Sequence, residues 1–273
     1  MQPRFLYMAL LVVPLGTPAF AQNPDRYVQV KAVQQGDGAV IEAVNDCLAP
    51  ITLTLDATLE NMEAKPGLPL TVTLQPRSNT TLAAVRRLNP QAKNRFSYRY
   101  NSHFGDPAAK HQDQHVYQLP FESQRTYQVS QGYGGAFSHQ GEDANALDFD
   151  LASGDKIMAA RAGLVIDTEA GQTAGGNDPK FRNHANYVLV LHDDSTIGRY
   201  IHLQPGGVRV GQKVQAGALL GLSGNTGYAD RPHLHFDVFR PLDGKRSERI
   251  QTKFRTTTAK AELLKEGQSY TRP

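Results

Sequence analysis

The sequence predicts a mainly β protein built in two parts. Short segments in which apolar and polar residues alternate recur along most of the chain, and clusters of turn residues separate them. A polar stretch interrupted by Pro107 and Pro120 divides these segments into two sets. The chain shows no long repeat, no heptad run and no low-complexity tract that would indicate another architecture.

Residues 1–21 have the features of a secretory signal peptide. The apolar run FLYMALLVVPLG follows MQPR and precedes Ala19-Phe20-Ala21, a small-x-small cleavage pattern. No later stretch reaches about 18 uninterrupted apolar residues, the length that spans a bilayer. The mature chain is therefore expected to be exported, without stable membrane insertion after signal removal. The alternative is an uncleaved anchor, but Pro14, Gly16 and Pro18 interrupt the segment where an anchor would continue.

Charge and cysteine content exclude two further classes. The net charge of +3 is nearly neutral, so there is no electrostatic reason to expect nucleic acid as a partner. Cys47 is the only cysteine, so the chain cannot form an internal disulfide. We interpret Cys47 as a small buried hydrophobic residue, with a reactive thiol or an intermolecular bridge as the alternatives.

Residues 22–98 are expected to form a small β-sandwich-like domain. Five short strand patterns at regular spacing favour this fold: YVQVKAV, AVIEAV, ITLTLDA, LTVTL and TTLAAV. The segment contains no cluster of chemically active residues. Three roles remain open for this domain: targeting the rest of the chain, inhibiting it by covering a groove, or binding a regulatory protein partner.

A connection over residues 99–124 leads to a second set of strands over residues 125–247. Their patterns are KIMAA, GLVIDTE, YVLVLHD, TIGRYIHL, ALLGLSG and LHFDVF. Residues 248–273 form a tail in which TTTAKAELLKEG has helical composition, with Thr256 to Thr258 as candidate caps. The tail is therefore expected to contain a short helix.

The stretch PHLHF suggests a metal site. In a strand, residues two apart point to the same face, so His233 and His235 would present both imidazoles together. An isolated H-x-H can be a chance surface pair. His139, which lies near several acids, and His202, in another strand pattern, strengthen the signal. Three protein ligands with one position open for water are typical of catalytic zinc.

The residues alone leave open which acid would join His139. Four carboxylates follow it in SHQGEDANALDFD: Glu142, Asp143, Asp148 and Asp150. The spacing H-x-x-x-D favours Asp143. The alternation in ALDF, typical of a strand that enters a core, favours Asp148, whereas GED has the composition of a polar turn. Asp150 shares a strand face with Asp148 and is the third alternative.

Between Tyr133 and Val238 the sequence resembles the M23 family of zinc metallopeptidases, the LytM or lysostaphin type that cuts peptides in bacterial cell walls. The resemblance rests on five motifs in this order: SHQG, DFDLASGDKIMAARAGLV, NYVLVLHDDSTIGRYIHL, VGQKVQAGALLGLSGNTG and PHLHFDV. It implies a LytM-type antiparallel β-sheet peptidase domain that holds one Zn²⁺ per chain.

The resemblance also selects the metal ligands. The family has a glycine six residues after the ligand aspartate, and Gly154 stands six residues after Asp148, whereas the same count from Asp143 reaches Phe149. The loop from the first ligand is thereby lengthened to nine positions, and Ala152 and Asp155 replace the usual proline and threonine. The implied ligands are His139, Asp148 and His235.

By the same resemblance, three further residues take part in catalysis. His233 would be the general base, and His202 would lie close by and help to bind or stabilise the oxyanion. Tyr133 would donate to the tetrahedral intermediate, with a packed or groove-lining aromatic as the alternative. Asp237 and Asp150 are both candidates to accept a hydrogen bond from a metal-bound imidazole.

Other polar residues of this region are expected to lie outside the site. Asp143 is interpreted as a solvated loop acid, and His184 and His192 as surface residues. The pair His111 and His115 has the spacing of a helical metal site, but its neighbours do not predict a helix.

Together these features predict an exported zinc metallo-endopeptidase that binds peptidoglycan peptide stems and hydrolyses their cross-links. The expected location is the periplasm, with secretion as the alternative. Two other functions remain open: a non-catalytic LytM-type regulator of a cell-wall amidase and a secreted general metalloprotease. The enzyme is favoured over the regulator because regulatory members typically lose metal ligands, and this sequence retains them.

Overall fold

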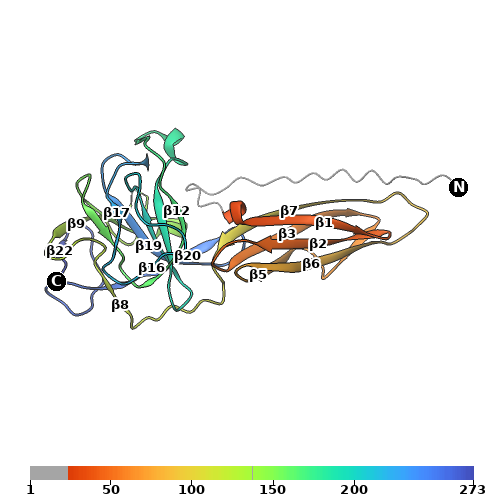
Figure 1. The fold of residues 1–273 in the computed structure, drawn as a ribbon, viewed down its shortest axis with the longest axis horizontal. Helices are drawn as coiled ribbons and strands as arrows, with labels where there is room; N and C mark the ends of the chain where they lie inside the picture. Colours follow the sequence, from red (N-terminus) through yellow and green to blue (C-terminus); the bar gives the residue numbers. More distant parts are fainter. Residues whose placement is uncertain (1–23, 137) are drawn as a thin grey trace. The chain divides into compact units, whose positions relative to one another are not determined.

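The computed structural model describes residues 24–136 and 138–273. The regular secondary structure of this part of the chain is almost all β-strand (Figure 1), which confirms the mainly β prediction. The predicted signal peptide lies outside the described residues. Within the described residues, no helix has the length and apolar character needed to cross a membrane.

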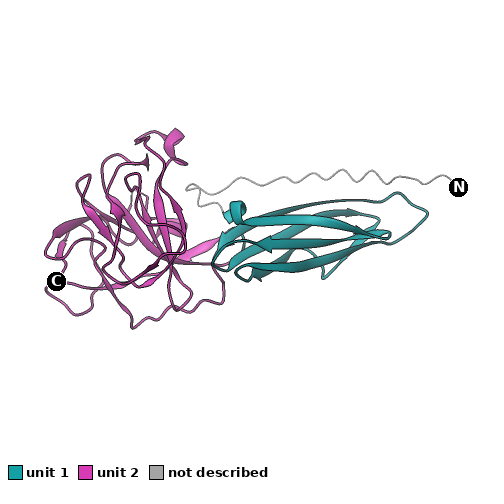
Figure 2. Ribbon diagram, viewed as in Figure 1, with its two compact units in different colours: residues 1–17, 23–104, 243–245 teal, residues 18–22, 105–242, 246–273 magenta. Residues whose placement is uncertain are grey.

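The chain divides into two compact units (Figure 2). The first contains the described residues up to Phe104 together with Asp243–Lys245. The second contains Gly105–Leu242 and Arg246–Pro273.

The first unit is built from two antiparallel sheets. It begins with a short 3₁₀ helix, η1 (Pro24–Tyr27). The four strands of one sheet are, in spatial order, β1 (Val28–Gln35), β2 (Gly38–Asn45), β6 (Ser78–Arg87) and β4 (Met62–Lys65). The strands of the other are β5 (Leu70–Leu74), β3 (Ile51–Glu60) and β7 (Arg95–Phe104). Every second residue of β2 is buried, as expected for a strand with one face on a core. Cys47 is 1% exposed, in agreement with its interpretation as a buried residue.

The second unit contains a nine-stranded antiparallel sheet. Eight strands follow one another in the order β16 (Lys213–Val214), β12 (Gly163–Glu169), β14 (Tyr187–Leu191), β15 (Ile197–Ile201), β19 (Leu234–Pro241), β10 (Leu147–Phe149), β9 (Thr126–Gln131) and β22 (Ser269–Thr271). The ninth strand, β20 (Ser247–Arg249), pairs with the end of β19.

Smaller elements surround this sheet. The paired strands are β11 (Lys156–Met158) with β17 (Leu219–Leu222), β13 (Gly175–Gly176) with β18 (Gly227–Tyr228), and β8 (Val116–Gln118) with β21 (Lys253–Arg255). Two 3₁₀ helices, η2 (Gly141–Asp143) and η3 (Pro179–Phe181), lie in loops. The core is rich in fully buried aromatic side chains: Tyr117, Phe121, Phe149, Tyr200, Phe236 and Phe254.

The short helix predicted in the carboxyl-terminal tail is absent. Phe254 and Glu262 instead exchange two backbone hydrogen bonds of 2.8 and 3.0 Å, and the chain then continues into β22 on the edge of the sheet. Phe254 and Leu264 are buried in the core, at 0% and 2% exposure. Helix propensity is a weak preference, and here the burial of these two side chains and the pairing with β9 override it.

Candidate metal centre

Strand pairing brings Asp148 beside His235. β10 and β19 are adjacent and antiparallel, and these two residues are direct partners in the register. Directly paired residues have Cβ atoms about 5 Å apart on the same face. The residues on either side, Leu147 and Phe149, turn to the opposite face and are buried in the hydrophobic core. As a result, His235 Nδ1 lies 3.0 Å from Asp148 Oδ1.

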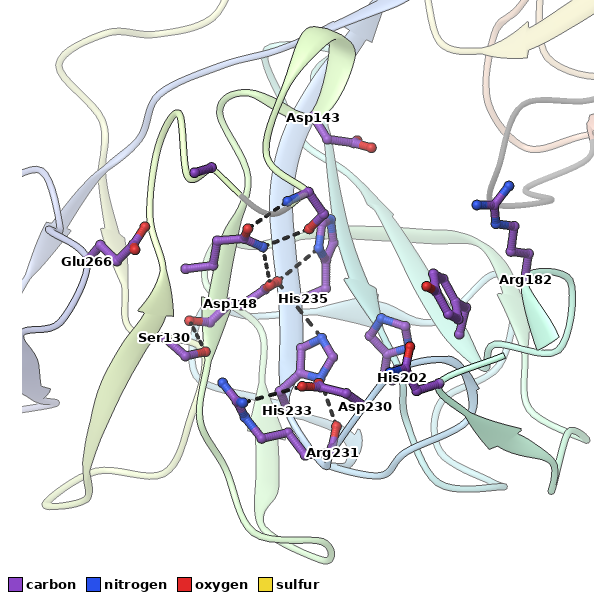
Figure 3. A pocket seen from close by; sticks show the side chains of 16 residues that line it. Ser130, Asp143, Asp148, Arg182, His202, Asp230, Arg231, His233, His235 and Glu266 are labelled. Atoms are coloured by element: carbon purple, nitrogen blue, oxygen red, sulfur yellow. Dashed lines mark hydrogen bonds and ion pairs between the residues drawn. The ribbon is translucent and has the colours of Figure 1, made fainter. Parts of the chain in front are cut away.

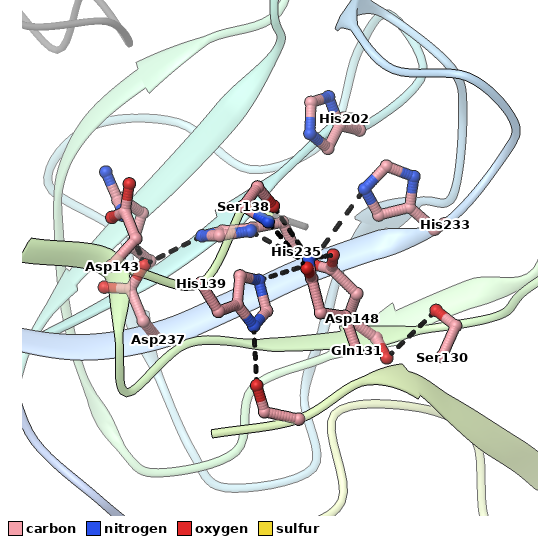
Figure 4. Close-up of polar contacts among 12 residues, drawn as sticks. Ser130, Gln131, Ser138, His139, Asp143, Asp148, His202, His233, His235 and Asp237 are labelled. Carbon is pink, nitrogen blue, oxygen red and sulfur yellow. Dashed lines mark hydrogen bonds and ion pairs between the residues drawn. The ribbon is translucent and has the colours of Figure 1, made fainter. Parts of the chain in front are cut away.

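His139 completes the cluster from the loop after β9 (Figure 4). Its Nδ1 donates to the carbonyl oxygen of Gly132 at 2.9 Å, which fixes the tautomer and leaves a lone pair on Nε2. Nε2 lies 3.3 Å from Asp148 Oδ1, is fully buried and makes no hydrogen bond. One ligand atom from each of His139, Asp148 and His235 lies within 4.8 Å of the other two.

This donor set fits zinc. Two imidazole nitrogens and a carboxylate oxygen are the ligands that catalytic zinc sites use with one position left open. The buried, unpaired Nε2 of His139 is itself a sign that a cation belongs there, because buried polar atoms otherwise have partners. Burial opposes ionisation of Asp148, but the close approach of the His139 and His235 imidazoles holds its pKa well below the usual range, so the carboxylate is charged.

Gln131 holds the candidate ligand Asp148 through Oδ2, the carboxylate oxygen that does not face the imidazoles. Its Nε2 donates to Asp148 Oδ2 at 2.9 Å and to Ser138 Oγ at 2.7 Å, and its Oε1 accepts from the Ser138 backbone at 2.8 Å. Gln131 thus engages only Oδ2, and Oδ1 is the oxygen that faces His139 and His235. Gln131 also fixes the residue that precedes His139. No motif indicates this role, which depends on the pairing of Gln131 with Asp148 across β9 and β10.

We expect Gln131→Met to weaken zinc binding by about 10–100-fold, the usual effect of losing a hydrogen-bonding partner of a ligand. The matched control is Gln128→Met on the same strand, because Gln128 is exposed and donates only to Gly267 O. Competition with a chromophoric chelator gives both affinities. Equal affinity in the two variants would contradict the role of Gln131.

His235 is oriented from behind by Asp237. Its Nε2 donates to Asp237 Oδ2 at 3.1 Å, and Arg199 Nε donates to the same oxygen at 2.7 Å. With Nε2 engaged by Asp237, Nδ1 is the ring nitrogen that faces Asp148 and the candidate metal position. Of the two acids considered from the sequence, the structure therefore assigns Asp237 to His235, while Asp150 pairs with Arg231 at 3.2 Å.

Asp143 is not the solvated acid that the sequence suggested. Its Oδ1 lies 3.0 Å from both Arg199 Nη2 and Arg249 Nη2. Sequence reasoning missed these arginines because they come from β15 and β20, distant in sequence from η2. Asp143, His235 and Asp237 also lie close enough together to suggest a metal cluster. Arg199 is already bound to the carboxylates of Asp143 and Asp237, so a cation in this second cluster would face a buried guanidinium. The cluster of His139, Asp148 and His235 is therefore the better metal site.

His202 and His233 lie beside the three candidate ligands (Figure 4). Their ring centroids are 4.5 Å apart, and His233 Nε2 is 4.0 Å from Asp148 Oδ1. Both rings donate from Nδ1 to backbone carbonyls: His233 to Arg231 O at 2.9 Å and His202 to Thr226 O at 2.7 Å. In the neutral rings, Nε2 is therefore an acceptor. Both histidines line a cavity of about 590 Å³ with Asp148 and His235.

Tyr133 is placed apart from this group. It is not among the residues that line the cavity, and its ring packs against the core. Its hydroxyl donates to Thr252 O at 2.9 Å and accepts from Thr252 N at 3.2 Å. The structure thus favours the packed alternative over donation to a reaction intermediate.

We accordingly expect Tyr133→Phe to leave kcat within about twofold of wild type and to lower the free energy of unfolding by about 1 kcal/mol, the typical loss for one hydrogen bond. Turnover and thermal unfolding of the same preparation check this. If kcat falls by about tenfold or more while the free energy of unfolding is unchanged, Tyr133 takes part in catalysis after all.

The surface position predicted for His192 is wrong. It is 4% exposed, and its Nδ1 lies 3.1 Å from Thr196 Oγ1 in the turn between β14 and β15. The ring contacts Tyr117 edge-on, with centroids 5.9 Å apart. His184 is half-buried. Neither residue lines the cavity.

The chain matches the model of peptidase family M23 over residues 142–248. These residues form an M23 peptidase domain. The M23 match includes Asp148, His202, His233 and His235, and His139 lies three residues before it.

Part of the chain is similar in sequence to two named endopeptidases. It is 34% identical over 106 residues to the peptidoglycan DD-endopeptidase ShyA of Vibrio cholerae, which is 38% of this chain and 22% of that protein. It is 32% identical over 111 residues to the glycyl-glycine endopeptidase ALE-1 of Staphylococcus capitis, which is 40% of this chain and 28% of that protein. The chain thus spans less than a third of the length of these curated relatives.

Among solved structures, the catalytic domain of the antimicrobial peptidase lysostaphin from Staphylococcus simulans is similar, with 24% sequence identity and a TM-score of 0.33. The similarity covers 46% of this chain and 87% of that one.

Proposed function

We propose that this protein is a zinc metallo-endopeptidase that hydrolyses peptide cross-links of bacterial peptidoglycan. The observation that carries the proposal is the convergence of His139, Asp148 and His235 at a cavity that also contains His202 and His233. The substrate class is supported by ShyA, whose name is that of a peptidoglycan endopeptidase. Residues 1–21 support export, with the periplasm as the proposed location.

In this proposal His139, Asp148 and His235 hold Zn²⁺. Zinc lowers the pKa of a coordinated water from about 15.7 to about 7 and so supplies a nucleophile at neutral pH. Asp237 keeps the His235 ring in place through the hydrogen bond to Nε2. Gln131 and the Gly132 carbonyl do the same for Asp148 and His139. The ligands are thus oriented before substrate binds.

His233 is proposed as the general base. Its Nδ1 proton is directed to Arg231 O, so Nε2 faces the cavity as an acceptor. At 4.0 Å from Asp148 Oδ1, Nε2 is close enough to the metal ligands to take a proton from the attacking water. The protonated ring can then return that proton to the leaving amine as the peptide bond breaks.

The tautomer of His202 refines the role expected for it. Burial lowers its pKa to about 3, and Nδ1 carries the single ring proton, which is donated to Thr226 O. In this form Nε2 accepts hydrogen bonds, for example from the water or from a substrate amide. Stabilisation of an oxyanion by donation requires a second proton on the ring. We therefore assign His202 to binding in the resting enzyme.

The test compares wild type with His233→Ala on chemically defined muropeptide dimers. We expect one zinc per chain in both proteins, cleavage by wild type, and a kcat lowered by about 10²–10⁴-fold in the variant, the usual contribution of a general base. Zinc content by elemental analysis and product release by chromatography are the measurements.

Two other results would replace the proposal. A wild-type protein that holds zinc but cleaves neither muropeptides nor casein would be a non-catalytic regulator of a cell-wall amidase. One that cleaves casein as fast as muropeptide dimers would be a general metalloprotease.

A further inference from the structure

Arg182 lines the cavity but has no part in the mechanism above. It follows η3, and its side chain lies on the same side of the cavity as His202 (Figure 3). Glu266 also lines the cavity and lies on the opposite side of His235 and His233. The two ends of the cavity therefore carry opposite charges.

The other charged side chains of the cavity have partners within the protein. Asp143 pairs with Arg199, Asp148 with His235, and Arg231 with both Asp150 and Asp230. Glu266 Oε2 accepts from the Gly132 backbone at 3.0 Å. Arg182 differs from them, because among the described residues no carboxylate lies within 4.0 Å of its guanidinium and no acceptor is bound to its side chain. Its hydrogen-bonding groups are thus available to a ligand.

Tyr228 orients this free guanidinium. The Arg182 Cζ atom lies 5.5 Å from the centroid of the Tyr228 ring, a cation–π contact. Contact with a ring face restricts the guanidinium plane but uses none of its N–H donors. Tyr228 is itself held in β18, which pairs with β13 at the start of the loop that contains Arg182. The donors are therefore partly preorganised at the cavity wall.

A planar guanidinium with free donors binds a carboxylate through two parallel N–H···O bonds. We propose that Arg182 binds a carboxylate of the peptide substrate, and that this protein prefers peptides with a free carboxylate close to the scissile bond. The acidic end at Glu266 disfavours the opposite orientation of such a peptide. This inference rests on the proposed function, because it names the substrate class of the same cavity.

The experiment uses synthetic peptide cross-link dimers in three forms. One has all carboxylates free, one is amidated at the carboxyl terminus, and one is amidated at the α-carboxyl group of the cross-linking diamino acid. The proteins are wild type, Arg182→Gln and Arg182→Lys. Lys180→Gln is the matched control, since Lys180 lies two residues away, pairs with Asp178 at 3.0 Å and does not line the cavity.

We expect Arg182→Gln to lower kcat/KM for the free-acid dimer by about 10–100-fold, the range for a charge-assisted hydrogen bond. Arg182→Lys should show a smaller loss, because lysine keeps the positive charge but lacks the two parallel N–H donors of the guanidinium. Lys180→Gln should leave kcat/KM unchanged. The dimer in which the carboxylate bound by Arg182 is amidated should have a lower kcat/KM with wild type, and Arg182→Gln should not lower it further. The amidated dimer that behaves in this way therefore identifies the carboxylate that Arg182 binds. Equal losses on all three dimers, or none, would overturn the inference.

Calorimetric binding of the same dimers to zinc-free wild type and Arg182→Gln separates this inference from the proposed function. If zinc-loaded wild type cleaves no dimer, the proposed function fails. The inference survives that result only if the free-acid dimer still binds wild type about tenfold or more tightly than Arg182→Gln.

Discussion

Asp148→Ala is expected to lose both zinc and peptide hydrolysis, while Asp143→Ala is expected to keep its zinc. Asp148 Oδ1 lies 3.0 Å from His235 Nδ1 and 3.3 Å from His139 Nε2, so its removal leaves two of the three proposed ligands. The loss of zinc affinity should exceed the 10–100-fold that is typical for a residue one step removed from the metal. Elemental analysis after dialysis against a weak chelator measures the retained zinc.

Asp143→Ala is the informative control because Asp143 has the more familiar spacing from His139. Its carboxylate is bound to Arg199 and Arg249 and lies behind His235, with Asp237 between the arginines and the ring. We expect lower stability without loss of zinc. The assignment of the ligand aspartate is wrong if Asp143→Ala loses zinc and Asp148→Ala retains it.

The sequence was informative about the strands that carry the candidate ligands, because the direction of each side chain along a strand follows from its position in the sequence. Side chains alternate along a strand, so the pattern in ALDF placed Asp148 on one face and its apolar neighbours on the other, as the structure shows. The same rule placed His233 and His235 together, and both line the cavity. The mainly β fold was predictable for the same reason.

The residues that support the ligands were not predictable, because they depend on pairing between distant strands. Gln131 reaches Asp148 only because β9 lies next to β10. Arg199 reaches Asp237 because β15 pairs with β19 in a register that sets these two residues opposite each other. Arg182 and Tyr228 meet through the pairing of β13 with β18. No spacing rule within one segment contains this information.

The same dependence on distant contacts explains the two main errors. TTTAKAELLKEG has the composition of a helix, but Phe254 and Leu264 are needed in the core and the chain continues as a strand on β9. Asp143 looked solvated because GED is a polar turn, yet two arginines from the sheet bind it. The polar composition of GED correctly predicts a turn, but it carries no information about the two arginines that bind Asp143.

Arg199→Met is expected to destabilise the second unit strongly. The Arg199 side chain is 3% exposed and is bound to Asp237, which is fully buried, and to Asp143. Removing one partner of a buried ion pair leaves an uncompensated charge and costs about 3–5 kcal/mol. For a domain of this size each kcal/mol lowers Tm by about 2–4 °C, so a fall of about 10 °C is expected.

Lys156→Gln is the matched control for this measurement. It removes a cation from a pair of similar length, Lys156 with Glu122 at 2.6 Å, but both side chains are largely exposed. Exposed pairs contribute about 0–1 kcal/mol, so Tm should change by no more than about 4 °C. Scanning calorimetry with and without zinc identifies the transition of the second unit as the one that zinc shifts, since a ligand stabilises the unit that binds it.

Arg199→Met should also weaken zinc binding, because Asp237 is the group that holds His235 in position. The expected loss is about 10–100-fold, as for other partners of a metal-binding imidazole. A variant that melts like wild type and binds zinc equally well would show that Arg249 alone balances Asp143 and Asp237. A variant that is destabilised but binds zinc normally would limit Arg199 to a structural role, because the orientation of His235 would then not depend on it.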